Sequence, residues 1–452
     1  MKELETKKPT NIAEMWRNEK WAWIESNTPY GTKDSKEVAA ARLAVKNEFI
    51  ADESLDEPRV TYPGIGITEV DDAILRYDRM LFDMSTDKRG EEGVLLRESV
   101  SRKLAELMRL RYVYRAEHTN DVVHRAELKR HAVELSHALF GEPDSGAVAY
   151  AIDSLAAQVA KSESPVANEI TKLLPTHDVT PRKPEIMSQE TIDTLAPILD
   201  EIFAPALEVI KKYPDTERTP KDACVIIQEM IDAMGFDGAR AVLSQGGALE
   251  TNGATLAIEV GYNRKAPVTN KVLDTVVLHE MTHLWGYWTA RHDDQDSIRG
   301  TGMPGTIASE EGKAVSVEQI RNGKAAERGQ VYVLASGLLE GTLDGNKRTF
   351  RQVYDVMWRR NILLDNSSMN DEKAIMTAKT KAYNSVMRVW RGGVSDTRDL
   401  SYSVGAEYAS RMMNDIAVLP DEERKEKLRF ILSRRVNYQD KSEMALMGWR
   451  ED

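Results

Sequence analysis

Apolar residues recur at helical spacing along most of the chain. Between residues 95 and 140 the pattern predicts two helices, and Leu104, Leu107 and Met108 lie on one face of the first. Gly141 and Pro143 end this region, because glycine and proline commonly follow the last turn of a helix. The same spacing predicts further helices over residues 147–160, 189–212 and 219–233.

Two stretches depart from this helical pattern. Residues 163–188 contain four prolines and are predicted to be a connector. Residues 239–243 and 255–260 alternate apolar positions and flank a glycine-rich segment, which predicts two strands or a hairpin. The expected fold class is therefore α+β, mostly helical with a small β-sheet. Because 452 residues exceed what one core usually covers, we expect a helical N-terminal region over 1–180 and a second domain over 181–452.

A predicted helix near residues 271–290 carries the clearest chemistry. It is largely apolar, yet it contains His279, Glu280 and His283. Histidines four positions apart project from one face of a helix, so both can bind one ion at about 2 Å. Glu280 is rotated away from that face and can act as general base on a metal-bound water. The alternative, two structural histidines beside an exposed glutamate, fits an apolar helix poorly because buried ionisable groups need partners.

A catalytic zinc site needs a third protein ligand and one open position. A polar loop follows His283, and Glu310 and Glu311 then open the next apolar helical pattern. His292, nine positions after His283, is the rival ligand. It lacks the glycine that turns the chain between the ligands of three-histidine sites, so Glu311 is favoured over His292.

The sequence around these residues resembles the microtubule-associated tyrosine carboxypeptidases and their bacterial relatives, named for a Gln-Glu-Gly-Leu-Ala motif. That family combines a helical HE…H motif with a Gly-Leu-Pro-Gly loop and a Glu-Gly-Leu-Ala segment. Here Gly-Met-Pro-Gly stands at 302–305 and Glu-Gly-Lys-Ala at 311–314. The resemblance implies a zincin-like metallopeptidase domain over 181–452, with Glu311 and not Glu310 as the third ligand.

A second block of sequence also follows the family layout. The family carries an Arg-Gly segment followed by Thr-Lys-Asp, a tyrosine and a glycine, and residues 388–405 match this order. The resemblance thus covers roughly residues 240–410. In that context Arg388 or Arg391 can bind the C-terminal carboxylate of a peptide, since arginine pairs with carboxylates in a bidentate way. Tyr402 can donate a hydrogen bond to a tetrahedral oxyanion. The alternatives are a solvated basic run, with Arg398 among its members, and a packed aromatic ring.

Two departures separate this chain from the family pattern. The family's histidines are usually five apart, which requires an irregular helix, whereas here they are four apart as in ordinary zincins. Lys313 also replaces the usual leucine. The first departure indicates a divergent branch, so the substrate of the tubulin enzymes does not transfer. Zinc hydrolysis is retained, because the four-residue spacing is geometrically the easier one.

Composition and net charge limit the classes of binding partner that we expect. The net charge of −12 argues against nucleic acid or an anionic membrane, since binding phosphates needs a basic surface. The single cysteine allows no intrachain disulfide. The first residues lack an apolar signal-peptide core, and no run approaches about 18 apolar residues. We therefore expect a cytoplasmic protein that does not bind membranes, and the oligomeric state stays open.

These patterns predict a zinc-dependent peptidase with a peptide or protein substrate and a zinc ion as cofactor. Glu280 and Tyr402 are the expected catalytic residues, with a carboxypeptidase as the finer possibility. The hairpin near 239–260 is expected at the edge of the cleft, where an extended peptide can add as a strand. Two alternatives remain: a zinc-dependent amide hydrolase with a non-peptide substrate, and a non-catalytic binding protein that contains zinc.

Overall fold

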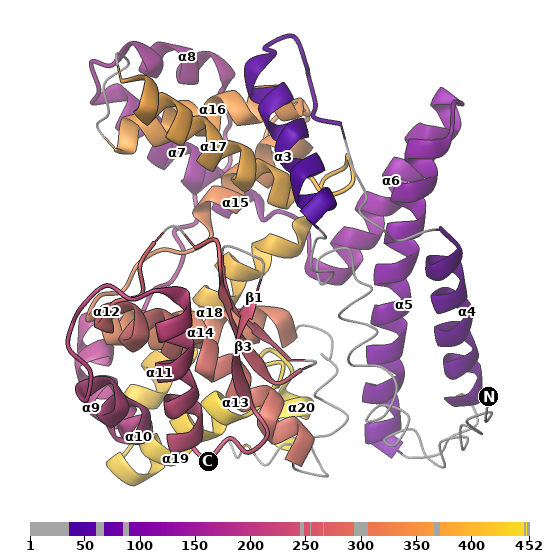
Figure 1. The fold of residues 1–452 in the computed structure, drawn as a ribbon. Helices are drawn as coiled ribbons and strands as arrows, with labels where there is room; N and C mark the ends of the chain where they lie inside the picture. Colours follow the sequence, from indigo (N-terminus) through magenta and orange to yellow (C-terminus); the bar gives the residue numbers. More distant parts are fainter. Residues whose placement is uncertain are drawn as a thin grey trace.

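The structure is a computed structural model that describes residues 36–59, 67–84, 90–244, 248–253, 255–264, 266–292, 306–365, 371–446 and 449. It is mostly helical and contains one three-stranded sheet in this part of the chain (Figure 1), which confirms the expected α+β class. Among the described helices, none is long and apolar enough to cross a membrane.

A first hydrophobic core holds the sheet and the helices around it. Their buried apolar faces meet in one cluster that includes Leu199, Ile227, Ile258, Leu284 and Leu432. The elements of this body are α9 (Gln189–Ile202), α10 (Ala204–Lys211), α11 (Pro220–Ala233), α12 (Asn270–Val272), the π-helix η1 (Leu273–Val277), α13 (Leu278–His292), α14 (Thr306–Asn322), α18 (Ser401–Ala417), α19 (Asp421–Ser433) and α20 (Lys441–Leu446). The single helix expected over 189–212 is divided at Phe203, and Pro205 lies in the first turn of α10, where a missing N–H costs nothing.

The sheet has the order β1-β3-β2, with β1 (Arg240–Ser244), β2 (Leu249–Asn252) and β3 (Ala257–Gly261). β1 pairs with β3 in parallel, and β2 pairs with β3 antiparallel. The two segments predicted as strands are confirmed as β1 and β3, but they do not form a hairpin with each other, because they pair in parallel and the antiparallel partner of β3 is β2, which lies between them in sequence. Apolar alternation could not reveal β2, since only Leu249 of its four residues is buried.

A second hydrophobic core combines segments from both sides of residue 180. Its members include Phe49, Ile152, Ile170, Leu338 and Val386. They belong to α3 (Lys36–Ala51), α7 (Ser145–Ala160), α8 (Pro165–Leu173), α15 (Gln330–Glu340), α16 (Phe350–Leu364) and α17 (Glu372–Val389). Helix α8 falls inside the stretch predicted as a connector, and this prediction is corrected. Pro165, the first proline of this stretch, occupies the first turn of α8, which is the one place in a helix that accepts proline well.

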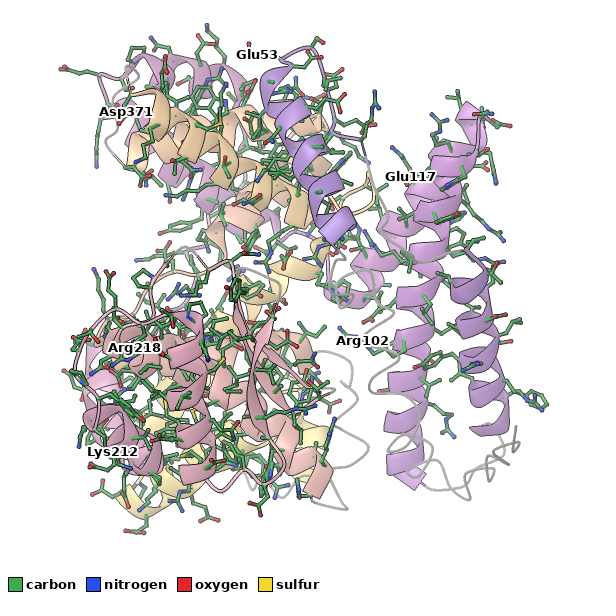
Figure 2. The ribbon with its side chains drawn as sticks, in the orientation of Figure 1. Glu53, Arg102, Glu117, Lys212, Arg218 and Asp371 are labelled. Carbon is green, nitrogen blue, oxygen red and sulfur yellow. The ribbon has the colours of Figure 1, made fainter. Side chains whose placement is uncertain are left out.

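Three further helices, the N-terminal arm, stand beside these two cores (Figure 1). The arm comprises α4 (Ile67–Met84), α5 (Gly90–His118) and α6 (Val122–Phe140). The two helices expected between residues 95 and 140 are confirmed, and Asp121 divides them by accepting hydrogen bonds from the first turn of α6. Figure 2 shows Arg102 on the side of α5 that faces the rest of the protein, where its guanidinium lies over the Phe140 ring.

Helices α14 and α18 cross at unusually close range. A Cβ atom on Gly312 would lie 2.1 Å from the carbonyl oxygen of Gly405, and one on Gly405 would lie 1.9 Å from that of Ala308. Only glycine at both positions allows this approach. The crossing brings Glu311 of α14 and Tyr402 of α18 to the same cavity.

Candidate metal centre

The two histidines lie on α13, directly after a π-helical turn. Thr269 caps the short helix α12, the π-turn η1 covers Leu273–Val277, and α13 begins at Leu278. Leu278, Met281 and Leu284 are buried in the first core, which fixes the orientation of α13. His279 and His283 project from its other side, with side chains 14% and 12% exposed.

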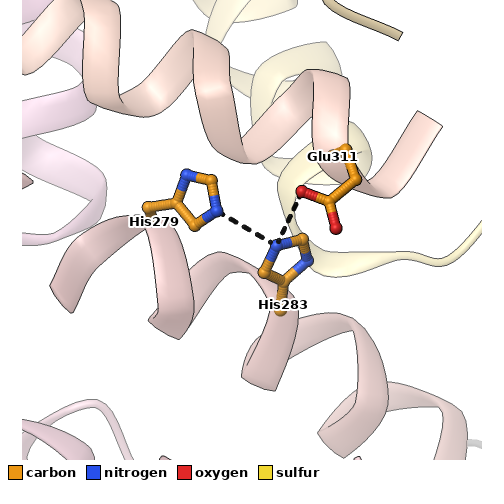
Figure 3. Close-up of side chains that lie close together, drawn as sticks. All are labelled: His279, His283 and Glu311. Carbon is orange, nitrogen blue, oxygen red and sulfur yellow. Dashed lines mark hydrogen bonds and ion pairs between the residues drawn. The ribbon is translucent and has the colours of Figure 1, made fainter. Parts of the chain in front are cut away.

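His279, His283 and Glu311 form a group that could hold a metal ion (Figure 3). The donor atoms, one from each residue, all lie within 4.8 Å of one another. The Nε2 atoms of the two histidines are 3.3 Å apart, and Glu311 Oε2 lies 4.0 Å from His283 Nε2. Neutral imidazoles and a carboxylate are the donor set that zinc prefers.

Neither of the two rival ligands belongs to the group. His292 is exposed at the end of α13, where its ring stacks on Trp288 and its Nδ1 bonds to the Trp288 carbonyl. Glu310 approaches His283 from the opposite side of the ring, with Oε2 3.6 Å from Nδ1. The loop at 302–305, which carries the Gly-Met-Pro-Gly resemblance, lies outside the described residues.

Each histidine has a carboxylate at the nitrogen that faces away from the group. Glu318 Oε2 lies 3.7 Å from His279 Nδ1, and Arg328 donates to Glu318 at 2.5 Å. Glu310 has the same relation to His283, and the fully buried Lys313 pairs with Glu310 at 2.7 Å. Carboxylates in this position orient metal-binding histidines and raise their basicity. Sequence reasoning missed Glu318, although it lies two helical turns after Glu311 on the same helix and could have been found from that spacing.

Burial and neighbouring charge set the protonation of the group. Burial, helped by His283 and Arg328, lowers the pKa of His279 to about 3, so this ring is neutral at pH 7. Burial also lowers the pKa of His283, but the hydrogen bond to Glu310 and the charge of Glu311 outweigh it and raise that pKa above its ordinary value. Burial raises the pKa of Glu311 as well. A bound cation would relieve the cost of burying this carboxylate.

Glu310 and Glu280 have opposite electrostatic environments. Burial alone would raise the pKa of Glu310, but Lys313 and His283 outweigh it and lower that pKa to about 2, so Glu310 is a permanent anion. Burial raises the pKa of Glu280 to about 7. Its carboxylate Oε1 lies 4.0 Å from His279 Nε2, beside the group and not within it.

The group opens into a cavity of about 550 Å³. One side is formed by the segment Ala248–Thr251, which includes the start of the edge strand β2. Thr251 fixes this strand to α13 by donating its hydroxyl proton to the Glu280 carbonyl at 2.8 Å. The other lining residues come from α13, α14, α17, α18 and the chain after α19: His279, Glu280, His283, Tyr287, Ile307, Glu310, Glu311, Arg388, Tyr402 and Arg435.

Of the three residues expected on the substrate side, the structure brings two to the cavity. Arg388 and Tyr402 line it, and the Arg388 guanidinium lies 4.9 Å from the centre of the Tyr402 ring. Arg391 does not line it and pairs with the buried Asp399 at 2.6 Å. Arg388 pairs with the other oxygen of Asp399 at 2.7 Å and keeps 40% of its side chain exposed.

Comparisons of the chain with protein-family models, with curated proteins and with solved structures give no match. The proposed function therefore rests on the geometry of this site and on the sequence patterns.

Proposed function

We propose that the protein is a zinc-dependent peptidase. The observation that carries the proposal is the convergence of His279, His283 and Glu311, with Glu280 beside them, in a cavity of about 550 Å³. Such a cavity is large enough for several residues of a peptide. The resemblance to the tyrosine carboxypeptidase family belongs to the proposal, with this chain as a divergent member.

The residues present fit a zinc ion. His279 Nδ1 and His283 Nδ1 lie 3.7 and 3.6 Å from Glu318 and Glu310, and the two Nε2 atoms lie only 3.3 Å apart on the side of Glu311. A cation between these two nitrogens and the Glu311 carboxylate would be stabilised by all three groups. His279, His283 and Glu311 would hold the metal, which when bound lowers the pKa of a water molecule and polarises the substrate carbonyl.

Glu280 acts as the general base in this proposal. Its carboxylate lines the cavity next to His279, where it accepts a proton from the attacking water and passes it to the leaving amine. A pKa of about 7 suits a group that must both accept and release a proton near neutral pH. Tyr402 lines the same cavity and donates a hydrogen bond to the oxyanion that forms at the cleaved carbonyl.

The peptide substrate adds to the sheet along β2. This strand is at the edge of the sheet and lines the cavity, so an extended peptide can add beside it as a further strand. Arg388 provides a cation on the other side, where it binds a free C-terminal carboxylate. Cleavage then removes residues from the C-terminus of the peptide.

The test compares the zinc-loaded wild-type protein with Glu280→Gln on a peptide library. Gln keeps the shape but cannot accept the proton, so zinc content should stay the same while cleavage falls by at least about a hundredfold. Equal rates in both proteins would reject Glu280 as the base. A wild-type protein that binds zinc but cleaves no peptide would reject the peptidase proposal.

A further inference from the structure

We propose that the N-terminal arm positions Arg388 in the cavity, through Arg109 of α5 and the buried Asp396 and Asp399 at the 3₁₀-turn η3 (Thr397–Leu400). Arg109, Asp396 and Asp399 are positioning residues in this proposal, because none of them is among the residues that line the cavity. The inference rests on the proposed function in one respect, namely that Arg388 contacts the substrate.

Asp399 is the direct partner of Arg388. Its side chain is 3% exposed, and its two oxygens accept from Arg388 at 2.7 Å and from Arg391 at 2.6 Å. One buried carboxylate between two guanidinium groups restricts both of them. The rings of Tyr332 and Tyr402 also flank Arg388, with centres 5.0 and 4.9 Å from its guanidinium, and Asp399 adds the charged hydrogen bond that fixes the direction of the guanidinium.

Arg109 connects the arm to the same turn. One of its terminal nitrogens, Nη2, lies 3.2 Å from Asp396 Oδ2 and donates to the Arg391 carbonyl at 3.2 Å. Asp396 is 1% exposed and accepts from the Arg398 amide at 2.9 Å, which caps η3. Arg109 therefore contacts the chain at Arg391 and at Asp396, which are the two ends of the segment that leads into η3.

Helix α6 adds a second connection between the arm and η3. The Ser136 hydroxyl accepts from the Thr397 amide at 2.9 Å, and the Thr397 hydroxyl bonds to the Ser136 carbonyl at 3.2 Å. Both residues are completely buried. The turn that carries Asp399 is thus held by two helices of the arm, and these contacts join positions more than 250 residues apart in sequence.

A purely structural role for Arg109 makes a different prediction from a positioning role. If Arg109 only stabilised the arm, its loss would lower the melting temperature and leave the state of Arg388 unchanged in the folded protein. If Arg109 positions Arg388, its loss frees the Arg388 guanidinium even where the protein remains folded. Arginine reactivity measures this difference without requiring any enzymatic activity.

The first experiment labels the full-length folded protein with phenylglyoxal and follows each arginine by mass spectrometry. Arg240, exposed on β1, is the internal reference. Relative to Arg240, labelling of Arg388 should rise about tenfold in Asp399→Asn. This fold-change corresponds to the free energy of one hydrogen bond between charged groups. It should rise several-fold in Arg109→Ala and less in Arg109→Lys, which restores the charge opposite Asp396.

Arg111→Ala is the matched control. Arg111 also lies on α5, but its ion pair at 2.7 Å is with Asp71 of α4 and not with a residue of η3. This variant should label Arg388 as the wild type does. Unchanged Arg388 labelling in both Arg109→Ala and Asp399→Asn would overturn the proposal. If Arg109→Ala does not fold, Arg109→Lys and Asp399→Asn decide it in the same way.

The second experiment measures cleavage of matched peptides with free and amidated C-termini. In Arg109→Ala, KM for the free acid should rise about fivefold with little change in kcat and with normal zinc content, while Arg109→Lys should recover most of the loss. An equal rise for both peptides would contradict positioning of a carboxylate-binding group. If the wild type cleaves neither peptide, the proposed function fails, and the labelling result still decides whether the arm positions Arg388.

Discussion

The two sides of the cavity are assembled over very different distances along the chain. On the histidine side, His279 and His283 are one turn apart on α13, and Glu310, Glu311 and Glu318 follow on the adjacent α14. On the arginine side, Arg388 comes from α17 and Tyr402 from α18, and the chain between these two residues contacts Arg109 on α5. The first side depends mainly on helix periodicity, and the second depends on packing between distant segments.

The largest expected effect comes from removing a ligand on the histidine side. His283→Ala should reduce bound zinc from about one per chain to background, because two remaining ligands do not hold a catalytic zinc. Metal analysis of the purified proteins checks this. His292→Ala removes an exposed histidine of the same helix and should keep its zinc. Equal zinc in His283→Ala and the wild type would contradict the site.

The next effect comes from separating the two sides. Gly405→Ala places a methyl group where the carbonyl oxygen of Ala308 lies 1.9 Å away, so α14 and α18 must move apart. We expect a loss of about 3 kcal/mol in the free energy of unfolding, measured with urea, at the upper end for overpacking. Val404→Ala changes the neighbouring, partly exposed residue and should cost less than about 1 kcal/mol. Similar values for the two variants would show that the helix crossing tolerates separation.

A third variant tests the carboxylates behind the histidines. Lys313→Leu introduces the residue usual in the resembling family and leaves Glu310 buried without its nearest cation. Zinc affinity, measured by chelator competition, should fall about tenfold, because Glu310 then orients His283 less well. Lys324→Leu, at an exposed position after α14, should have no effect. The double variant Glu310→Gln, Lys313→Leu should unfold less easily than Lys313→Leu, since position 310 then carries no buried charge that has lost its nearest cation.

On the arginine side the expected effect is smaller and specific to substrate. Arg388→Gln should raise KM for peptides with a free C-terminus by about tenfold. This change corresponds to the free energy of one hydrogen bond to a charged group. Peptides with an amidated C-terminus should show no such change. Steady-state kinetics on matched peptide pairs makes the measurement. Wild-type cleavage of both peptides at the same rate would reject the carboxypeptidase part of the proposal and leave the zinc hydrolase intact.

The smallest expected effect concerns the contact between the arm and α15. The hydrogen bond to Glu340 raises the pKa of His137 above 6.5, although burial opposes it. The folded-state pKa is the higher one, so this contact stabilises the protein fully below pH 6.5 and loses its effect as pH rises through the folded pKa. His137→Asn should therefore cost about 1 kcal/mol at pH 5.5 and less at pH 8.5 in urea unfolding.

The same contrast explains how well the sequence predicted the fold. Helices such as α7 and α11 were predicted within a few residues, because their apolar spacing is a local property. Strand β2 and helix α8 were missed, one for lack of apolar alternation and the other because prolines marked it as a connector. The division at residue 180 stays a prediction, while the second hydrophobic core includes Ile152 and Val386 from either side of it.

What the sequence by itself determined is the meeting of His279 and His283, with Glu280 rotated beside them, because four residues make about one helical turn wherever the helix lies. The resemblance to the carboxypeptidase family, and not helix spacing, selected Glu311 over Glu310 as the third member of the group. Only the tertiary structure decided that Arg388 and not Arg391 reaches the cavity, that Lys313 is buried against Glu310, and that the N-terminal arm contacts η3. These contacts join residues whose separation in sequence carries no information about distance, and the close crossing of two glycines and the pairing of buried charges fix them in space.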